Sequence, residues 1–269
     1  MGLKTYDKWP DGSTTIDKVH WTSGDDYCIE QEKASQEDNQ TPPVEDGDNL
    51  GLKIALRPIK QFTILRAEFP SEIVDELNSH IETVTIPKNK DYSRGLVGQL
   101  KNDDRSAQLD FSLTDDIGKT VKIILDQCGT TYLKTGCERN ATADVTQAWV
   151  NRAYAGDYNP YHDHGGVTTS AGLSGFVWLK VPECIEKLDA FVPKFNNAGG
   201  GIDGFTHLVW GTTTLRDVQQ LRPITEDYIK PEVGTMIIFP NWLKHAVLPF
   251  YGEGERRSIA FNWEVNDAK

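Results

Sequence analysis

The sequence lacks any apolar stretch of about 18 residues, the length needed to span a membrane as a helix, and its start carries no apolar run typical of a signal peptide. Positive charge is also scarce, since 28 Lys and Arg stand against 40 Asp and Glu, for a formal net charge of −12. This balance disfavours nucleic acid and anionic membranes as partners, because both are negatively charged. We therefore expect a soluble cytoplasmic protein, and no pattern indicates its oligomeric state.

Cysteine and histidine are scarce as well. The four cysteines, Cys28, Cys128, Cys137 and Cys184, are scattered and form no CxxC pair. This spacing disfavours a dense disulfide framework, and reduced thiols are expected even for Cys128 and Cys137, which could bridge a loop. The chain has six histidines in 269 residues, so two of them placed one residue apart require an explanation.

The residue pattern divides the chain into three parts. Residues 1–50 are polar and rich in Asp, Glu, Gln and Ser, which is typical of an irregular arm. Residues 51–144 mix strand-like and helix-like patterns, and residues 145–269 contain short β-type runs separated by turn residues. We predict an α+β fold that is mainly β, in which 51–144 supports a C-terminal β core of the same domain.

Two segments of the support region have helical periodicity. Apolar residues recur at helical spacing over residues 69–84 and again over residues 113–133. In the second segment, Thr114 is a candidate N-cap, and Asp115 and Asp116 suit the positive end of the helix dipole. We expect both helices to pack on one side of the β core.

The two closely spaced histidines are His162 and His164, in the stretch NPYHDHGG. In a strand, residues i and i+2 point to the same side, so both imidazoles can face inward while Asp163 points away. A third candidate ligand, His245, follows a strongly apolar strand in PEVGTMIIFPNWLKHAV. Three such side chains can form a facial metal site that leaves the remaining coordination positions open, and imidazole suits Fe, Zn, Cu and Ni alike.

A candidate anion site lies 11 residues after His245. Arg256 and Ser258 alternate onto one face of the final strand, and Arg257 points to the other face. A guanidinium fork beside a hydroxyl group is suited to binding a carboxylate through two parallel hydrogen bonds. Asn151, on an earlier strand, is a further candidate hydrogen-bond partner for a ligand bound there.

Four stretches of the chain, taken in order, resemble the motifs of the Fe(II)- and 2-oxoglutarate-dependent oxygenases. They are NPYHDHGG, GLSGFVWLKVP, PEVGTMIIFPNWLKHAV and RRSIAFN. The resemblance covers roughly residues 145–265. It implies a double-stranded β-helix, or jelly-roll, core. It also implies Fe(II) and 2-oxoglutarate as cofactors, with O2 and a primary substrate that no motif identifies. The implied activity is a dioxygenase, in most cases a hydroxylase, that couples C–H oxidation to the decarboxylation of 2-oxoglutarate to succinate.

Carried over by position, the resemblance implies that His162, His164 and His245 are the metal ligands and that Arg256, assisted by Ser258, binds the distal carboxylate of 2-oxoglutarate. The chain departs from the family at His164, because the common pattern is H-x-D or H-x-E. Asp163 could serve as the ligand in place of His164 if a β-bulge turned it inward.

Two other classes of protein remain open at this point. A cupin-like three-histidine dioxygenase would use the same metal ligands without 2-oxoglutarate, and Arg256 would then matter little for turnover. A non-catalytic jelly-roll module would retain the metal as a structural element and would consume no oxygen.

Overall fold

The computed structural model of the chain describes residues 19–22, 62–93, 96, 98, 107–165, 171–188, 201–211 and 225–268. The predicted N-terminal arm therefore lies outside the described residues, apart from Val19–Thr22, which differ from the prediction because they form a strand. Residues 51–61 of the predicted support region also lie outside them.

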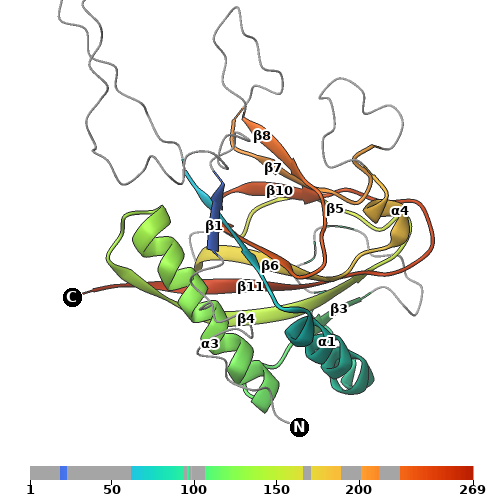
Figure 1. Ribbon diagram of the computed structural model, residues 1–269, viewed down its shortest axis with the longest axis horizontal. Coiled ribbons are helices and arrows are strands. Elements are labelled where there is room, and N and C mark those ends of the chain that lie inside the picture. The colour runs from blue at the N-terminus through green and yellow to red at the C-terminus, as the bar shows by residue number, and fades with distance from the viewer. Residues whose placement is uncertain are drawn as a thin grey trace, which may run out of the picture.

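Two antiparallel sheets form the body of the protein (Figure 1). The major sheet has the order β1 (Val19–Thr22), β2 (Ile64–Glu68), β9 (Thr235–Pro240), β6 (Ala171–Lys180), β11 (Arg256–Asp267), β4 (Ala141–Ala153) and β3 (Ala107–Asp110). The minor sheet has the order β5 (Asn159–His162), β10 (Lys244–Val247), β7 (Thr206–Val209) and β8 (Glu226–Ile229). All of these strand pairs are antiparallel.

The chain passes repeatedly between the two sheets from β4 onward. Strands β4, β6, β9 and β11 belong to the major sheet, and the strands between them, β5, β7, β8 and β10, belong to the minor sheet. This alternation is the double-stranded β-helix topology, so the predicted fold class is confirmed. Its consequence is that residues far apart in the sequence meet between the sheets.

The two longest described helices, α1 (Ser71–His80) and α3 (Asp116–Thr131), cover the outer face of the major sheet (Figure 1). The bounds are α1 Ser71–His80, continued by a π-helical turn at Ile81–Thr85 and by α2 Ile86–Lys88; α3 Asp116–Thr131, continued by a π-helical turn at Tyr132–Gly136; and α4 Glu183–Glu186. The predicted cap of α3 is wrong by one residue, because Asp115, not Thr114, accepts the hydrogen bond from the Gly118 N–H at 2.8 Å. No described helix is long and apolar enough to cross a membrane.

Strand β11 separates the two sides of the major sheet by simple alternation. Ile259, Phe261 and Trp263 are fully buried in the core between the sheet and the helices, where burying each such side chain contributes about 1.5–3 kcal/mol. Residues Arg256, Ser258, Ala260 and Asn262 point the other way and line a cavity between the sheets. The side of β11 that faces the minor sheet therefore carries the polar side chains of a site.

Candidate metal centre

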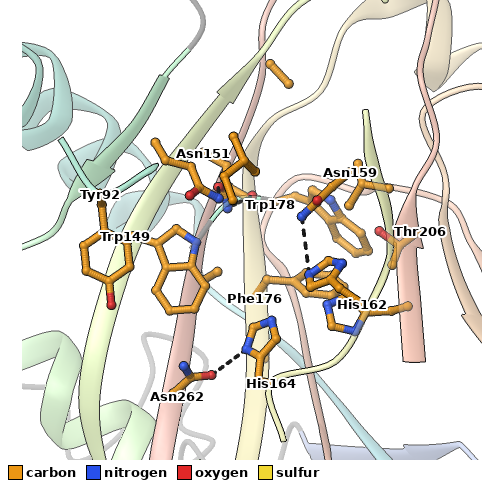
Figure 2. Close-up of a pocket in the computed structure, with 18 of the residues that line it drawn as sticks. Tyr92, Trp149, Asn151, Asn159, His162, His164, Phe176, Trp178, Thr206 and Asn262 are labelled. Atoms are coloured by element: carbon orange, nitrogen blue, oxygen red, sulfur yellow. Dashed lines mark hydrogen bonds between the residues drawn. The ribbon is translucent and has the colours of Figure 1, made fainter. Parts of the chain in front are cut away.

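Three histidines converge between the sheets (Figure 2). His162 is the last residue of β5 and pairs directly with His245 on β10. His164 lies beyond the end of β5, unlike the continuous strand that the sequence predicts, and its backbone N–H donates to the Asn241 carbonyl at 2.9 Å. The ring centroids are 4.2 Å apart for His162 and His245, 5.2 Å for His164 and His245, and 5.4 Å for His162 and His164.

The hydrogen bonds of the three rings fix which nitrogen of each ring carries the proton. Nδ1 of His162 donates to the Pro160 carbonyl at 2.8 Å, and Nδ1 of His245 donates to the Leu243 carbonyl at 3.0 Å. Nδ1 of His164 donates to a side-chain oxygen, Oδ1 of Asn262. Because Nδ1 carries the proton in each ring, Nε2 is the nitrogen with the lone pair that could bind a metal.

Burial keeps these rings neutral. It lowers the pKa of His162 and of His164, and it lowers the pKa of His245 to about 3, with a smaller contribution from the two neighbouring rings. Neutral imidazoles at neutral pH leave three lone pairs available, and the potential ligand atoms lie within 4.8 Å of one another. The donor set therefore fits a first-row transition metal held on one face.

Two further polar side chains near the histidines, Asp163 and Asn159, differ in their contacts. Asp163 is exposed, and its Oδ1 accepts the Gly165 N–H at 3.1 Å, so its carboxylate is not part of the three-residue cluster. Asn159 Nδ2 lies 3.3 Å from Nε2 of His162, the nitrogen that a metal would occupy. Its Oδ1 is buried and has no hydrogen-bond partner among the described residues. A metal would therefore displace this amide from His162.

The cavity beside the histidines has a volume of about 350 Å³ and contains the three predicted cosubstrate residues. Arg256 is buried, and its Nη1 donates to the Gly204 carbonyl at 2.8 Å, which fixes the guanidinium group. Burial lowers the pKa of Arg256 to about 10, opposed by Asp157, so the side chain stays positively charged at neutral pH. Ser258 and Asn151 are cross-strand neighbours, 3.4 Å apart at Oγ and Nδ2.

Aromatic side chains form much of the remaining wall. Trp149 stacks on Tyr92, with ring centroids 5.2 Å apart, and its other neighbour is His164 at 5.7 Å (Figure 2). Phe176, Trp178 and Phe239 also line the cavity. A site with one cation, several amides and aromatic walls can bind a small carboxylate next to a metal and exclude water from it.

The sequence did not single out Asn262, which contacts His164 (Figure 2). The signal was present, because Asn262 continues the alternation of Arg256, Ser258 and Ala260 along β11. Arg257 points away from the cavity, as predicted, and binds Glu82 and Glu255 on the helix side of the sheet.

The chain is similar to one family of known proteins and to several solved structures. The family model described as 2OG-Fe(II) oxygenase matches residues 147–262. A prolyl-4-hydroxylase from Pseudomonas putida is 12% identical, with a TM-score of 0.46, covering 77% of this chain and 93% of that one. A collagen prolyl hydroxylase from Paramecium Bursaria Chlorella virus-1, bound to 2-oxoglutarate, is 20% identical, with a TM-score of 0.44 and coverage of 76% and 96%. No curated protein matches the chain.

Proposed function

Residues 147–262 belong to the superfamily of 2-oxoglutarate- and Fe(II)-dependent oxygenases, and from this premise we propose that the protein is a hydroxylase whose Fe(II) is held by His162, His164 and His245. The observation that carries the proposal is the convergence of three neutral imidazoles, each with Nδ1 hydrogen-bonded and the lone pair therefore on Nε2. Asp163 is not proposed as a ligand, because its carboxylate accepts a backbone hydrogen bond outside the cluster.

We propose that Arg256 binds the distal carboxylate of 2-oxoglutarate, with Ser258 and Asn151 as neutral hydrogen-bonding partners. Arg256 is buried beside the histidines in one cavity, where a charge-assisted pair with a carboxylate is strong because little water competes for it. Gln108 donates to Asn151 Oδ1 at 2.8 Å, so the amide group of Asn151 is held with Nδ2 toward Ser258.

When bound, Fe(II) and 2-oxoglutarate supply O2 activation, in which oxidation of a substrate C–H bond is coupled to decarboxylation of 2-oxoglutarate to succinate and CO2. The chain contributes orientation and exclusion of water. His162, His164 and His245 would hold the metal, and Arg256 would hold the far end of the cosubstrate. The cytoplasmic location and the division at residues 50 and 144 remain predictions.

The decisive experiment is an anaerobic titration of the Fe(II)-loaded protein with 2-oxoglutarate, followed by its visible metal-to-ligand charge-transfer band. We expect a band in the wild type, no band in His164→Ala, and a weaker band that saturates only at higher 2-oxoglutarate in Arg256→Ala. Stoichiometric bound iron without a band in the wild type would contradict the proposal.

The all-histidine donor set favours one second candidate, a three-histidine dioxygenase that does not use 2-oxoglutarate. Under that alternative the wild type would bind iron and consume O2 with another organic substrate, and Arg256→Ala would turn over normally. A third outcome, metal-dependent melting without O2 consumption with any 2-oxoacid, would indicate a non-catalytic binding module.

A further inference from the structure

The three histidines differ in what anchors them. His162 and His245 each donate from Nδ1 to a backbone carbonyl two residues earlier, that of Pro160 within β5 and that of Leu243 immediately before β10. His164 lies beyond the end of β5, and its Nδ1 instead donates to the side-chain oxygen Oδ1 of Asn262, 98 residues away, at 2.7 Å. Its orientation therefore depends on a side chain from another sheet.

Asn262 is itself held from both sides. On β6, Ser174 Oγ donates to Asn262 Oδ1 at 2.8 Å and lies 3.1 Å from His164 Nδ1. On β4, Gln147 Oε1 accepts from Asn262 Nδ2 at 2.8 Å. Ser174 and Gln147 are the direct cross-strand neighbours of Asn262 in the β11 ladders, so the amide has one favoured orientation, with Oδ1 toward His164.

Burial strengthens the preference of this network for its hydrogen-bonded arrangement, including the bond between His164 and Asn262. Ser174 is fully buried and Asn262 is 8% exposed. A buried polar group that loses its partner is left without compensation for the water it gave up, so each of these groups is favoured in its paired arrangement. The proton on Nδ1 of His164 is therefore held in place by an acceptor that cannot easily turn away.

We propose that Asn262 is the positioning residue that makes His164 a metal ligand. It holds the proton on Nδ1, leaves the lone pair on Nε2, and fixes the ring plane of a histidine that the end of β5 does not fix. The inference rests on the proposed function only in that the three histidines bind a metal. Without the Asn262 acceptor, His164 can adopt the tautomer with the proton on Nε2, which leaves no lone pair on that nitrogen for a metal, and the ring can rotate away from the other two rings.

The test compares three variants of the full chain for anaerobic binding of Fe(II) and of Co(II). Asn262→Leu removes the acceptor, and we expect the dissociation constant for both metals to rise about 10- to 100-fold, the range seen when a hydrogen-bond partner behind a metal ligand is lost. Asn262→Asp keeps an acceptor for His164, and Gln147 can rotate its amide to donate to it, so we expect affinity within about threefold of the wild type or higher.

The matched control is Asn159→Leu. Asn159 is also an asparagine in contact with a candidate ligand, but it contacts Nε2 of His162, the metal-binding side, and not the anchored side. Its removal should leave metal affinity equal or slightly higher, because the metal no longer displaces an amide. A loss in Asn159→Leu equal to that in Asn262→Leu would indicate a general effect of cavity mutations and would overturn the proposal.

Proton NMR of the Co(II)-loaded protein supplies a readout that a purely structural role would not change. Each histidine bound through Nε2 keeps an exchangeable proton on Nδ1 that the paramagnetic ion shifts far from the diamagnetic region. We expect three such resonances in the wild type, one of them lost or exchanging rapidly in Asn262→Leu and restored at a new position in Asn262→Asp. Three unchanged resonances in Asn262→Leu would overturn the proposal.

Two further variants keep the result interpretable. If His245→Ala binds metal as tightly as the wild type, the proposed three-histidine metal site is refuted. If His245→Ala loses affinity but Asn262→Leu keeps the wild-type affinity, only the role of Asn262 is refuted. If Asn262→Leu does not fold, Ser174→Ala relaxes the same amide without introducing bulk. We then expect a smaller rise in the dissociation constant, about threefold to tenfold, and no change would overturn the proposal.

Discussion

Replacing Arg257 by Met should destabilise the fold without weakening cosubstrate binding. The Arg257 side chain is completely buried on the helix side of β11. Its Nε and Nη2 form a two-point contact with the Glu255 carboxylate at 2.8 and 2.9 Å, and Nη2 also binds Glu82 on the π-helical turn at 2.7 Å. The neighbouring Arg256 points into the cavity on the opposite face.

The size of the effect follows from what the substitution leaves behind. Removing one partner from a buried charge pair costs about 3–5 kcal/mol, because the other charge stays buried without compensation. Here Glu255 keeps a contact with Arg152 at 3.0 Å, and Glu82 is half exposed and keeps Lys180 at 2.8 Å. We therefore expect a loss near the lower end, about 3 kcal/mol in the free energy of unfolding.

The chain offers a matched control for this substitution. Arg139 forms the same two-point contact with Asp267, at 2.7 and 2.8 Å, but both side chains are more than half exposed. Arg139→Met should therefore cost only about 0–1 kcal/mol. Urea unfolding of the metal-free proteins, with equal slopes, measures both losses. Equal losses in the two variants, or a loss below about 1 kcal/mol in Arg257→Met, would refute the reasoning.

Three further predictions concern the cosubstrate, acid stability and metal. In an anaerobic 2-oxoglutarate titration, Arg256→Met should raise the dissociation constant by at least about 30-fold, since breaking a buried charge pair costs about 2–5 kcal/mol. Arg256→Lys should raise it less. Unchanged affinity in Arg256→Met would contradict the proposed binding of the carboxylate by Arg256. Lys180 and then Arg257 hold the pKa of Glu82 at about 2, below its usual 4.5, so the stability that Glu82 contributes is complete above about pH 4.5 and is lost as the pH falls toward 2. We expect the unfolding free energies of the wild type and Glu82→Gln to differ by about 1 kcal/mol after screening by solvent. This difference should be constant at neutral pH and vanish near pH 2. A difference that grows on acidification would contradict the prediction. Fe(II) at about 100 times its dissociation constant should stabilise the wild type by about 2.7 kcal/mol, an effect that a chelator reverses; the same stabilisation in His245→Ala would contradict the proposed ligands.

Much of the fold could be predicted from local sequence. Short apolar runs punctuated by turn residues are sufficient to predict the strands β4, β6, β7, β9, β10 and β11, because strand alternation and turn chemistry are local properties. The same alternation predicts that Arg256 and Ser258 share a face and that Arg257 points away, as the structure has them. The three histidines that the sequence selected do converge.

The features that sequence reasoning missed are set by contacts between distant residues. His164 leaves the β5 strand because its backbone bonds to Asn241 after β9, and no local pattern contains that contact. Asn262 acquires its partners from β4 and β6, and Arg257 acquires Glu82 from the π-helical turn that follows α1, each more than 80 residues away. Thr114 and Asp115 both have side chains that favour the N-cap position of α3, so the sequence does not distinguish them. The hydrogen bond from the Gly118 N–H to Asp115 Oδ1 identifies Asp115 as the cap.

Strand β5 lies at the edge of the minor sheet and pairs with β10 at two residue positions, His162 with His245 and Asn159 with Val247. An edge strand with so few paired positions opens locally at a low free-energy cost. An ion held by His162 and His245 would cross-link that edge to its neighbour, whereas Arg256 and Ser258 lie on β11, which is paired along both sides. The wall of the cavity that carries His162 would thus gain rigidity on loading, whereas the wall that carries Arg256 is held by the major sheet with or without the ion.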